Sequence, residues 1–232
     1  MAKSKIIKDL ANGVVDTQTA LKRTKVLLQD LGDKDLLNWV SYEIGGYPDD
    51  SDVPEYRVVS GQLYGSYFKG SMVSHMKYSN VPLPLGKMPE ELQHSVIWHE
   101  IRTAIGALKD TLDEDKDNLG FSVVIPADFY SAIAHYNNDP YMIITSASVK
   151  LNMPQIRNIF SQVESKLLDV LTYLEKKFGP LDELDIDVDR KTPEEMDEII
   201  NHLSLVIYND NSVNIGDNNR IKESTIASKN EK

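Results

Sequence analysis

The fold is decided in residues 39–57, WVSYEIGGYPDDSDVPEYR, where the chain changes from helix-forming to strand-forming residues. The stretch begins with the apolar spacing of a helix, and Gly45 and Gly46 then stop that helix. Pro48 and Pro54 enclose a polar run that is typical of a loop, and the residues after this stretch are rich in Tyr, Val, Ser and Gly. A helical segment followed by extended segments predicts an α+β fold.

Two helices are predicted before this point. Apolar residues between positions 20 and 31 recur at helical spacing, and Gly32 provides a favourable left-handed end. Asp33 is placed to cap a second helix over residues 34–44. The sequence therefore predicts an N-terminal pair of helices joined by a one-glycine corner.

An antiparallel β-meander is predicted after the loop. Residues 56–64 alternate in the manner of a strand, residues 71–78 are extended as well, and residues 69–70 supply the turn. Gly61 and Gly65 lie on one face of the first strand, where missing side chains permit the close approach of another backbone. Further elements are predicted as a helix over residues 89–108, short strands over 121–125 and 141–151, and a short helix over 127–136.

The C-terminal part begins with the longest helical pattern, over residues 153–178, which spans about 40 Å as a helix. Residues 184–188 then alternate between apolar and acidic, which predicts a strand with one solvated face. Thr192 and Glu195 form a capping box for a helix through His202. A long C-terminal amphipathic helix and a capped shorter one are therefore expected.

Three regions follow from these patterns. Residues 1–190 are expected to form the α+β domain, and residues 191–208 a capped helix and a short strand. Residues 209–232 are an Asn- and Gly-rich tail that predicts very short β-rungs. Because units of this kind need about three or more copies to be stable, we expect the tail either to fray or to associate with other chains.

Composition excludes several classes of protein. The chain of 232 residues has no cysteine, which excludes disulfides, thiolate metal sites and cysteine nucleophiles. It has 36 acidic and 25 basic side chains, a net charge of −11, so a broad nucleic-acid-binding surface is not expected. No apolar run reaches the roughly 18 residues that a membrane helix needs, and the lysine-containing N-terminus does not resemble a signal peptide. We expect a cytoplasmic protein without a membrane partner.

The charge is unevenly distributed along the chain. Residues 182–198 hold nine acidic side chains against Arg190 and Lys191, which accounts for most of the net charge. A basic cluster lies near the N-terminus and fits either a contact with an acidic partner or a solvated helix face. Its members are Lys3, Lys5, Lys8, Lys22, Arg23 and Lys25.

The acidic strand over residues 182–189 is the strongest pattern for catalysis. Asp185, Asp187 and Asp189 share one face of the predicted strand and could hold a divalent metal for a hydrolase or nuclease. The alternative is a solvated strand face, because alternation alone places polar residues outward. An EF-hand is excluded, since Arg190 stands where its glycine belongs. The sequence has no nucleophile elbow and no glycine-rich phosphate loop, so no cofactor is expected.

The aromatic-rich stretch is the candidate binding site. One interpretation is that its aromatic side chains close the core beneath a loop. The other is a recognition surface in which a carboxylate and a guanidinium serve as polar anchors among aromatic rings. The candidate residues are Trp39, Glu43, Tyr47, Tyr56 and Arg57.

The same region resembles the AbiTii domain of bacterial abortive-infection proteins. The resemblance is carried by Leu31, Gly32, Leu36, Trp39, Glu43, Gly46, Tyr47, Pro54, Tyr56, Arg57, Gly61 and Gly65, and residues 155–178 resemble the long helix that follows in relatives. It covers roughly residues 1–190. The resemblance implies a role in antiphage defence and brings no catalytic residues with it.

We therefore expect a component of an abortive-infection system that acts as a non-enzymatic sensor, adaptor or effector through protein–protein contacts. The alternative is a metal-dependent hydrolase or nuclease that uses the acidic strand over residues 182–189. A protein partner, or self-association through the tail at 209–232, is expected in the first case.

Overall fold

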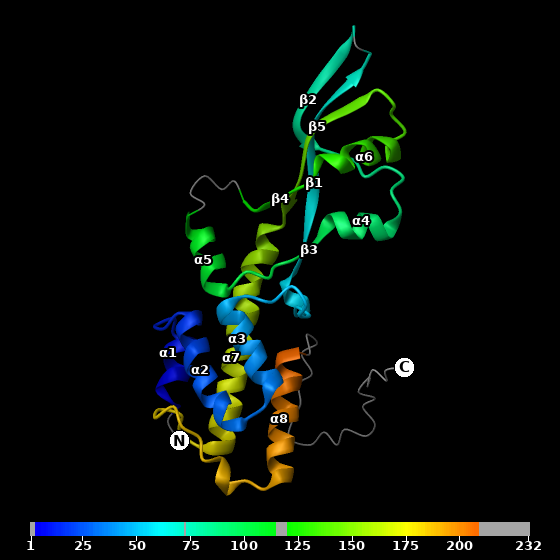
Figure 1. The fold of residues 1–232 in the computed structure, drawn as a ribbon. Coiled ribbons are helices and arrows are strands. Elements are labelled where there is room, and N and C mark those ends of the chain that lie inside the picture. The colour runs from blue at the N-terminus through cyan, green and yellow to red at the C-terminus, as the bar shows by residue number, and fades with distance from the viewer. Residues whose placement is uncertain (1–2, 72, 115–119, 209–232) are drawn as a thin grey trace, which may run out of the picture.

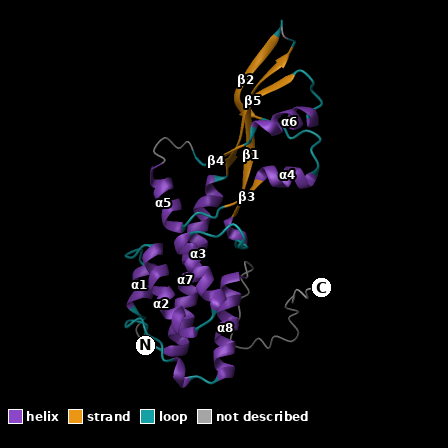
Figure 2. Cartoon of the chain, viewed as in Figure 1, coloured by secondary structure: helices purple, strands orange, loops and turns teal. Residues whose placement is uncertain are grey.

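The computed structural model describes residues 3–71, 73–114 and 120–208. Helices form a body at one end of the molecule, and an antiparallel sheet with two short helices projects from it (Figure 1). Figure 2 shows the strands confined to this projecting part, so the predicted α+β class is confirmed. We call the projecting part the β lobe; it comprises β1 (Val58–Gly70), β2 (His75–Pro82), α4 (Glu90–Ile97), β4 (Ser122–Val124), α6 (Tyr130–Tyr136) and β5 (Met142–Leu151).

The helical body contains the predicted N-terminal pair. Asp16 accepts a hydrogen bond from the main-chain N–H of Thr19 at 2.8 Å and so caps the first of these helices. Gly32 ends that helix at a φ of 69°, and Asp33 caps the second, as predicted. The body is built from α1 (Lys5–Ala11), α2 (Thr17–Leu31), α3 (Lys34–Gly45), α5 (Ile105–Glu114), α7 (Met153–Phe178) and α8 (Pro193–Tyr208).

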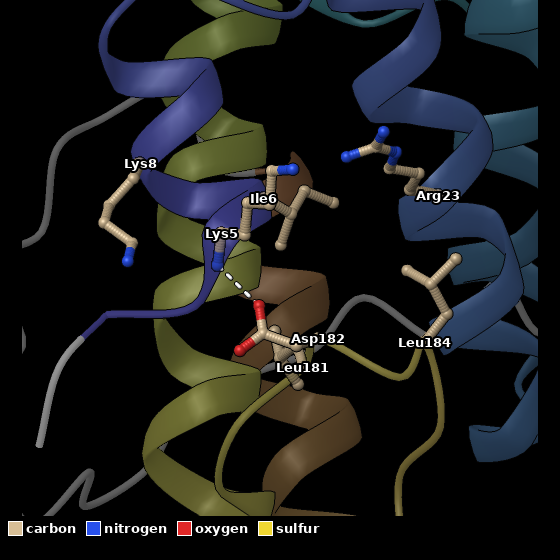
Figure 3. Close-up of a pocket in the computed structure, with 7 residues that line it drawn as sticks. All are labelled: Lys5, Ile6, Lys8, Arg23, Leu181, Asp182 and Leu184. Atoms are coloured by element: carbon tan, nitrogen blue, oxygen red, sulfur yellow. Dashed lines mark hydrogen bonds between the residues drawn. The ribbon is translucent and has the colours of Figure 1, made fainter.

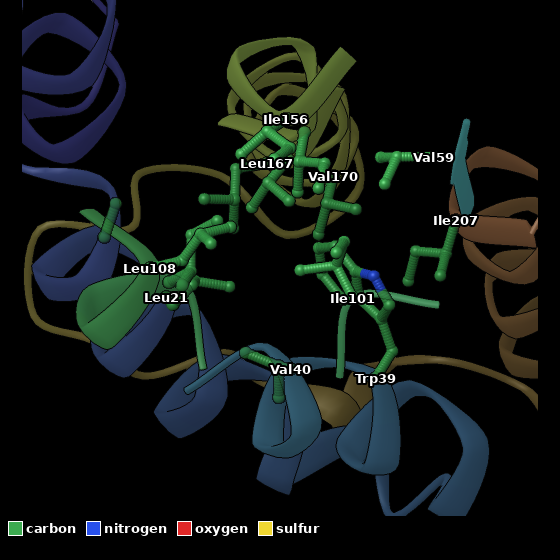
Figure 4. Packing of buried hydrophobic residues seen from close by; sticks show 14 of the residues in the cluster. Leu21, Trp39, Val40, Val59, Ile101, Leu108, Ile156, Leu167, Val170 and Ile207 are labelled. Atoms are coloured by element: carbon green, nitrogen blue, oxygen red, sulfur yellow. The ribbon is translucent and has the colours of Figure 1, made fainter. Parts of the chain in front are cut away.

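The long helix α7 is the central element of the body and has the predicted bounds. It packs against α1, α2 and α8, and Figure 4 shows side chains of α2 and α3 directed toward Leu167 and Val170 of α7. Its apolar face is buried along its whole length because apolar residues recur every three or four positions. No helix within the described ranges is long and apolar enough to cross a bilayer.

The sheet has the strand order β2-β1-β5-β4, and each neighbouring pair is antiparallel. The two predicted glycines are required where β1 meets β5. A Cβ atom on Gly61 would lie 2.8 Å from the carbonyl oxygen of Lys150, and one on Gly65 would lie 2.9 Å from that of Ser146. The short strand β3 (Trp98–Glu100) pairs with the start of β1, at the junction with the body.

The β lobe has one covered and one open face. α6 packs on β5 and α4 on β1, and both helices lie on the same side of the sheet (Figure 2). Leu63 and Gly65 face these helices and are buried, whereas Tyr64 and Phe68 alternate with them and point the other way. Ile143 is paired with Phe68 and remains 59% exposed. Within the described ranges, no helix covers this second face around these three residues.

The prediction of one helix over residues 89–108 is wrong. α4 ends at Ile97, and Trp98–Glu100 instead form β3 against Val58–Ser60. A new helix, α5, starts only at Ile105. A continuous helix would satisfy its own main-chain groups but would leave the start of β1 without this partner strand, so pairing with β1 outweighs the local helical spacing.

The predicted strand over residues 184–188 is also wrong. Leu184 has a φ of 55°, which no strand residue adopts, and a 3₁₀ turn, η3 (Val188–Arg190), follows. The segment connects α7 to α8, where the described part of the chain offers no strand to pair with. Leu181 and Ile186 are buried and anchor this connection to the helices instead.

The predicted capping box is confirmed. The N–H of Thr192 donates to Oε2 of Glu195 at 3.0 Å, and the N–H of Glu195 donates to Oγ1 of Thr192 at 3.3 Å. The helix α8 continues beyond His202 to Tyr208, so the short strand expected within residues 191–208 is absent. The tail at 209–232, for which β-rungs were predicted, lies outside the described residues.

Candidate functional site

The five predicted binding residues lie together where the helical body meets the β lobe. Trp39 and Glu43 project from one face of α3, four residues apart. Tyr47 follows that helix, and Tyr56 and Arg57 belong to the short turn η1 (Glu55–Arg57) that leads into β1. We call these five residues the junction cluster.

A buried ion pair forms the centre of the junction cluster. Arg57 donates from Nη2 to Oε2 of Glu43 at 2.5 Å and from Nε to Oε1 at 3.0 Å, and both side chains are 0% exposed. The remaining donor, Nη1, reaches the carbonyl oxygens of Ile101 and Thr103 at 2.7 and 2.8 Å. The guanidinium therefore binds the chain between β3 and α5 as well as α3, which also explains why the helix predicted there is interrupted.

The aromatic residues complete the polar contacts of Glu43. The hydroxyls of Tyr47 and Tyr56 each donate to its Oε1 at 2.8 Å, and Nε1 of Trp39 donates to the hydroxyl of Tyr56 at 2.9 Å. Burial and the charge of Glu43 raise the pKa of both tyrosines well above the usual range. Burial disfavours the charged form of Arg57, but the hydrogen bonds and charge of Glu43 outweigh it, so its pKa is raised. The raised pKa keeps the guanidinium of Arg57 charged inside the cluster.

This geometry makes the junction cluster a connector between α3, β1 and β3. No side-chain N or O atom buried in the described residues lacks a hydrogen-bond partner. Four members are at least 93% buried, with exposed fractions of 1% for Trp39, 0% for Glu43 and Arg57, and 7% for Tyr47. Direct recognition of a partner by these side chains stays a prediction, and it would require the junction to open.

Sequence reasoning missed one further member of this region. Lys166 of α7 is only 6% exposed, donates to the carbonyl oxygen of Val206 at 3.1 Å, and holds its ammonium 5.5 Å from the ring centre of Tyr56. The available signal was its position, three residues after Val163 and four before Val170, on the buried face of α7.

The acidic residues predicted as an alternative metal site do not come together. They lie in the irregular connection between α7 and α8 and in η3 rather than on one strand face, and Asp187 forms an ion pair with Arg190 at 2.6 Å. Within the described residues, no group of three or more metal-ligating side chains could hold a metal ion. The premise of the alternative site, with Asp185, Asp187 and Asp189 on one face, is therefore corrected.

A second candidate site lies between α1, α2 and the connection from α7 to α8 (Figure 3). It is a pocket of about 490 Å³ that we call the basic pocket. The guanidinium of Arg23 reaches from α2 toward the side chains of α1, and the carboxylate of Asp182 accepts the main-chain N–H of Lys5 at 2.6 Å. The pocket is lined by Lys5, Ile6, Lys8, Arg23, Leu181, Asp182 and Leu184. Three members of the N-terminal basic cluster thus meet at one site.

Comparison with known proteins identifies the family. The family model for AbiTii matches residues 4–198, which include the helical body, the β lobe and the junction cluster. No curated protein and no solved structure gives a significant match to the chain. The chain therefore belongs to the AbiTii family, and this membership suggests a role in abortive-infection phage defence.

Proposed function

We propose that the protein acts in abortive infection as a non-enzymatic sensor, adaptor or effector that works through protein–protein contacts. The observation that carries this proposal is the open face of the β lobe. Tyr64, Phe68 and Ile143 lie on that face, and Ile143 is 59% exposed. Exposed apolar side chains that are grouped on one surface are typical of an interaction site.

The outer edge of β2 supports the same proposal. Among the described residues β2 is the last strand on its side of the sheet, so its outer edge offers a row of main-chain groups with which another chain could pair. The four strands β2-β1-β5-β4 contain no acidic residue, but they contain Lys69, Lys77 and Lys150. Lys69 is paired with Asp139 at 2.9 Å, and the ammonium of Lys150 lies 4.2 Å from the ring centre of Tyr64 on the open face. Lys77 and Lys150 are the lysines that would attract a partner. The partner that fits this surface is an extended protein segment that carries acidic residues.

The junction cluster would give this surface a fixed position. Arg57 joins the start of β1 to α3 and to the chain after β3 through buried hydrogen bonds. A partner bound on the β lobe would therefore be held at a defined orientation to the helical body. An adaptor or sensor needs this property, because it must present two surfaces at once.

The test is a phage plaquing assay on a host that expresses the gene with its genomic neighbours. Ile143→Lys places a charge on the open face at a side chain that is already 59% exposed, so we expect normal folding and loss of plaque reduction. Val26→Lys is the matched control, because Val26 is an exposed aliphatic residue on α2, 42% exposed, away from the β lobe. Full protection by Ile143→Lys, or equal loss in both variants, would overturn the proposed surface.

We further propose that the tail at 209–232 mediates self-association by pairing with the tails of sister chains. Its isolated apolar residues cannot bury one another within a single copy. The point from which it starts is fixed, because Ile207 is buried and the hydroxyl of Tyr208 donates to the carbonyl oxygen of Asp35 at 2.9 Å. Deletion of residues 209–232 is expected to lower the mass measured by light scattering. An unchanged mass would refute this role of the tail.

A further inference from the structure

We propose that the far end of the β lobe binds the surface of a membrane that contains anionic lipids, with its apolar side chains among the headgroups. This end is formed where β1 turns into β2 and where β5 begins, and it lies opposite to the helical body (Figure 1). We call it the lobe tip, and its members are Val73, Met76, Lys77, Tyr141 and Ile143. The proposal does not depend on the protein contacts proposed above. The expectation from the sequence that no membrane partner exists concerned spanning helices, which a surface of this kind does not need.

Strand pairing brings the members of the lobe tip together. Lys77 and Ile143 both pair with Phe68 of β1, so the three residues lie side by side across the sheet. Met76 is the neighbour of Lys77 on β2, and Tyr141 lies two residues before Ile143. Because successive residues of an extended chain are about 3.3 Å apart, these four members lie within about 10 Å of one another along the strand direction.

The apolar members of the lobe tip are largely exposed to solvent. Val73, in the turn between β1 and β2, is 97% exposed, and Met76 and Tyr141 are each 63% exposed. Ile143 is 59% exposed. A single exposed apolar side chain is ordinary, but four of them at the same end of one lobe mark an interaction site.

The shape of the lobe tip favours a fluid surface as its partner. The end of the hairpin protrudes from the molecule (Figure 1), and Val73 lies in its turn with almost no neighbouring atoms around the side chain. A protein that covers a protruding apolar end needs a matching cavity, whereas the headgroup region of a bilayer rearranges around the side chains that enter it. Aliphatic residues and tyrosine are the side chains that proteins place at that depth.

The charges at the lobe tip select the class of lipid. Lys77 is exposed and follows directly after Met76, on the side toward the helical body. Residues 58–89, which include β1, β2 and the turn between them, contain no acidic residue. The carboxylate of Asp139 is compensated by its ion pair with Lys69 at 2.9 Å. Apolar side chains at the end of the hairpin and a lysine just behind them fit a bilayer with anionic headgroups, because the lysine meets those headgroups when the apolar side chains enter.

The first experiment measures co-sedimentation of the full-length chain with lipid vesicles. One set of vesicles contains phosphatidylcholine and phosphatidylserine at about two to one, and the other set contains phosphatidylcholine alone. We expect the mixed vesicles to bind the chain at least about fivefold more tightly, which is the contribution of one lysine near an anionic surface. No binding to the mixed vesicles, or equal binding to both sets, would overturn the proposal of an anionic membrane.

Variants then locate the binding. Val73→Asp should weaken binding to the mixed vesicles at least about tenfold, because it replaces an apolar side chain that enters the headgroup region with a carboxylate. The fold should not change, since Val73 is almost fully exposed. Val14→Asp is the matched control: Val14 is 74% exposed and lies between α1 and α2 in the helical body. A comparable loss in both variants would show a response to negative charge in general and would overturn the assignment to the lobe tip.

Lys77→Gln distinguishes the lobe tip from the rest of the open face. We expect this variant to lose the preference for mixed vesicles and Lys150→Gln to keep it. Lys150 pairs with Gln62, six residues before Phe68 on β1, and is therefore about 20 Å from Lys77 along the strands. This separation exceeds the range of about 10 Å over which charges act at ordinary salt concentrations. An equal loss of the preference in both lysine variants would overturn the assignment to the lobe tip.

Val73→Trp provides a spectroscopic test of insertion. Indole prefers the headgroup region, so we expect tighter binding and a shift of the fluorescence to shorter wavelength when mixed vesicles are added. Val14→Trp should show no shift, and both variants keep the two native tryptophans, so the difference comes from the new side chain. No shift in Val73→Trp would overturn insertion of the lobe tip. The plaquing result for Ile143→Lys would still decide the proposed protein surface, so the two proposals fail separately.

Discussion

Glu43 is the acceptor at which the buried hydrogen bonds of the junction cluster meet. Its two oxygens accept four hydrogen bonds, two from Arg57 and one each from Tyr47 and Tyr56, while the side chain is fully buried. A buried carboxylate is tolerated only when its charge is paired and its lone pairs are filled. Arg57 and the two tyrosines meet that condition, so the loss of Arg57 would leave a buried charge without its partner.

The first prediction concerns Arg57→Met, which removes the guanidinium and keeps most of the volume. The carboxylate of Glu43 would remain buried without its cation, so we expect a loss of about 3–5 kcal/mol in the free energy of unfolding. Urea denaturation of the variant and the parent measures this difference. Lys109→Met serves as the control, because the Lys109–Asp113 pair is exposed on both sides and its removal should leave the midpoint unchanged. A loss similar to that of the control would show that the junction pair is solvated.

The second prediction concerns the acid side of the pH profile. Partial burial disfavours the charge of Glu175, but the hydrogen bonds and charge of Lys3 and the hydrogen bonds of Ser4 outweigh it and lower the pKa to about 2, from 4.5 in the unfolded chain. A lowered pKa stabilises the fold above pH 4.5, and this contribution is lost as the pH falls from 4.5 toward 2. Glu175→Gln should therefore be less stable than the parent at pH 6, with the difference shrinking toward pH 2.5. Urea midpoints across this range measure it, and a constant difference would contradict the assignment.

The stability of the helix α8 depends on the capping box at its N-terminus. Its capping box satisfies two main-chain N–H groups, and the helix then buries Ile199, Leu203 and Ile207 against the body. Thr192→Ala removes the side-chain acceptor, so we expect a loss of about 1 kcal/mol in the free energy of unfolding. Thr192→Ser keeps the hydroxyl and should retain most of the stability. Urea denaturation of the three proteins checks both expectations, and equal stability of the Ala and Ser variants would contradict the role of the cap.

Elements whose partners are close in sequence could be predicted, and elements fixed by distant partners could not. The helices at α2, α3 and α7 follow from apolar spacing and caps that lie within each segment. The local pattern around Trp98–Glu100 predicts a helix. The segment is a strand because it pairs with Val58–Ser60, some forty residues earlier. Residues 184–188 alternate like a strand, but the described helices around them offer no strand edge to pair with. Hydrophobic periodicity predicts which residues of a segment will be buried. It does not predict which other part of the chain will pack against them.

The candidate sites, too, could be predicted where their residues are close in sequence and could not where the residues are distant. The composition of residues 39–57 pointed to five residues that the fold indeed brings together. It could not show that Arg57 also binds the carbonyl groups of Ile101 and Thr103, because that contact depends on where β3 ends. The basic pocket combines α1, α2 and the chain after α7, and only the tertiary fold places Lys5 and Arg23 on the same cavity.

The acidic side chains that give the protein its net charge of −11 are concentrated in one segment rather than distributed evenly over the molecule. Residues 182–198 carry nine of the acidic side chains, whereas the four strands of the β lobe carry none. The basic pocket sits beside the acidic connection, and Asp182 belongs to both. A charged partner would therefore meet an acidic segment at the end of the helical body and strands without carboxylates in the β lobe, and this difference favours one orientation of approach over others.

The helical body and the β lobe share one hydrophobic core, which leads to the last prediction. Val59 and Val149 of the sheet belong to the same buried cluster as Leu167 of α7, and Trp39 lies beside the junction pair. Because the buried residues of the described chain form one cluster that spans both parts, the two parts should unfold in a single transition. Trp98→Phe leaves Trp39 as the only tryptophan, so its fluorescence reports on the junction. We expect its urea transition to coincide with the loss of helical circular dichroism.

Two separated transitions in that experiment would mean that the β lobe unfolds independently of the body. Trp98 is 40% exposed, so its replacement by Phe should not itself uncouple the two parts. Arg57→Met in the same background provides the internal comparison, because it removes the buried contacts that join β1 to α3. If the two transitions coincide in the parent but separate in that variant, with the fluorescence transition at the lower urea concentration, the junction cluster is what couples the lobe to the body. A partner bound on the β lobe would then stabilise the whole chain only as long as Arg57 and Glu43 remain paired.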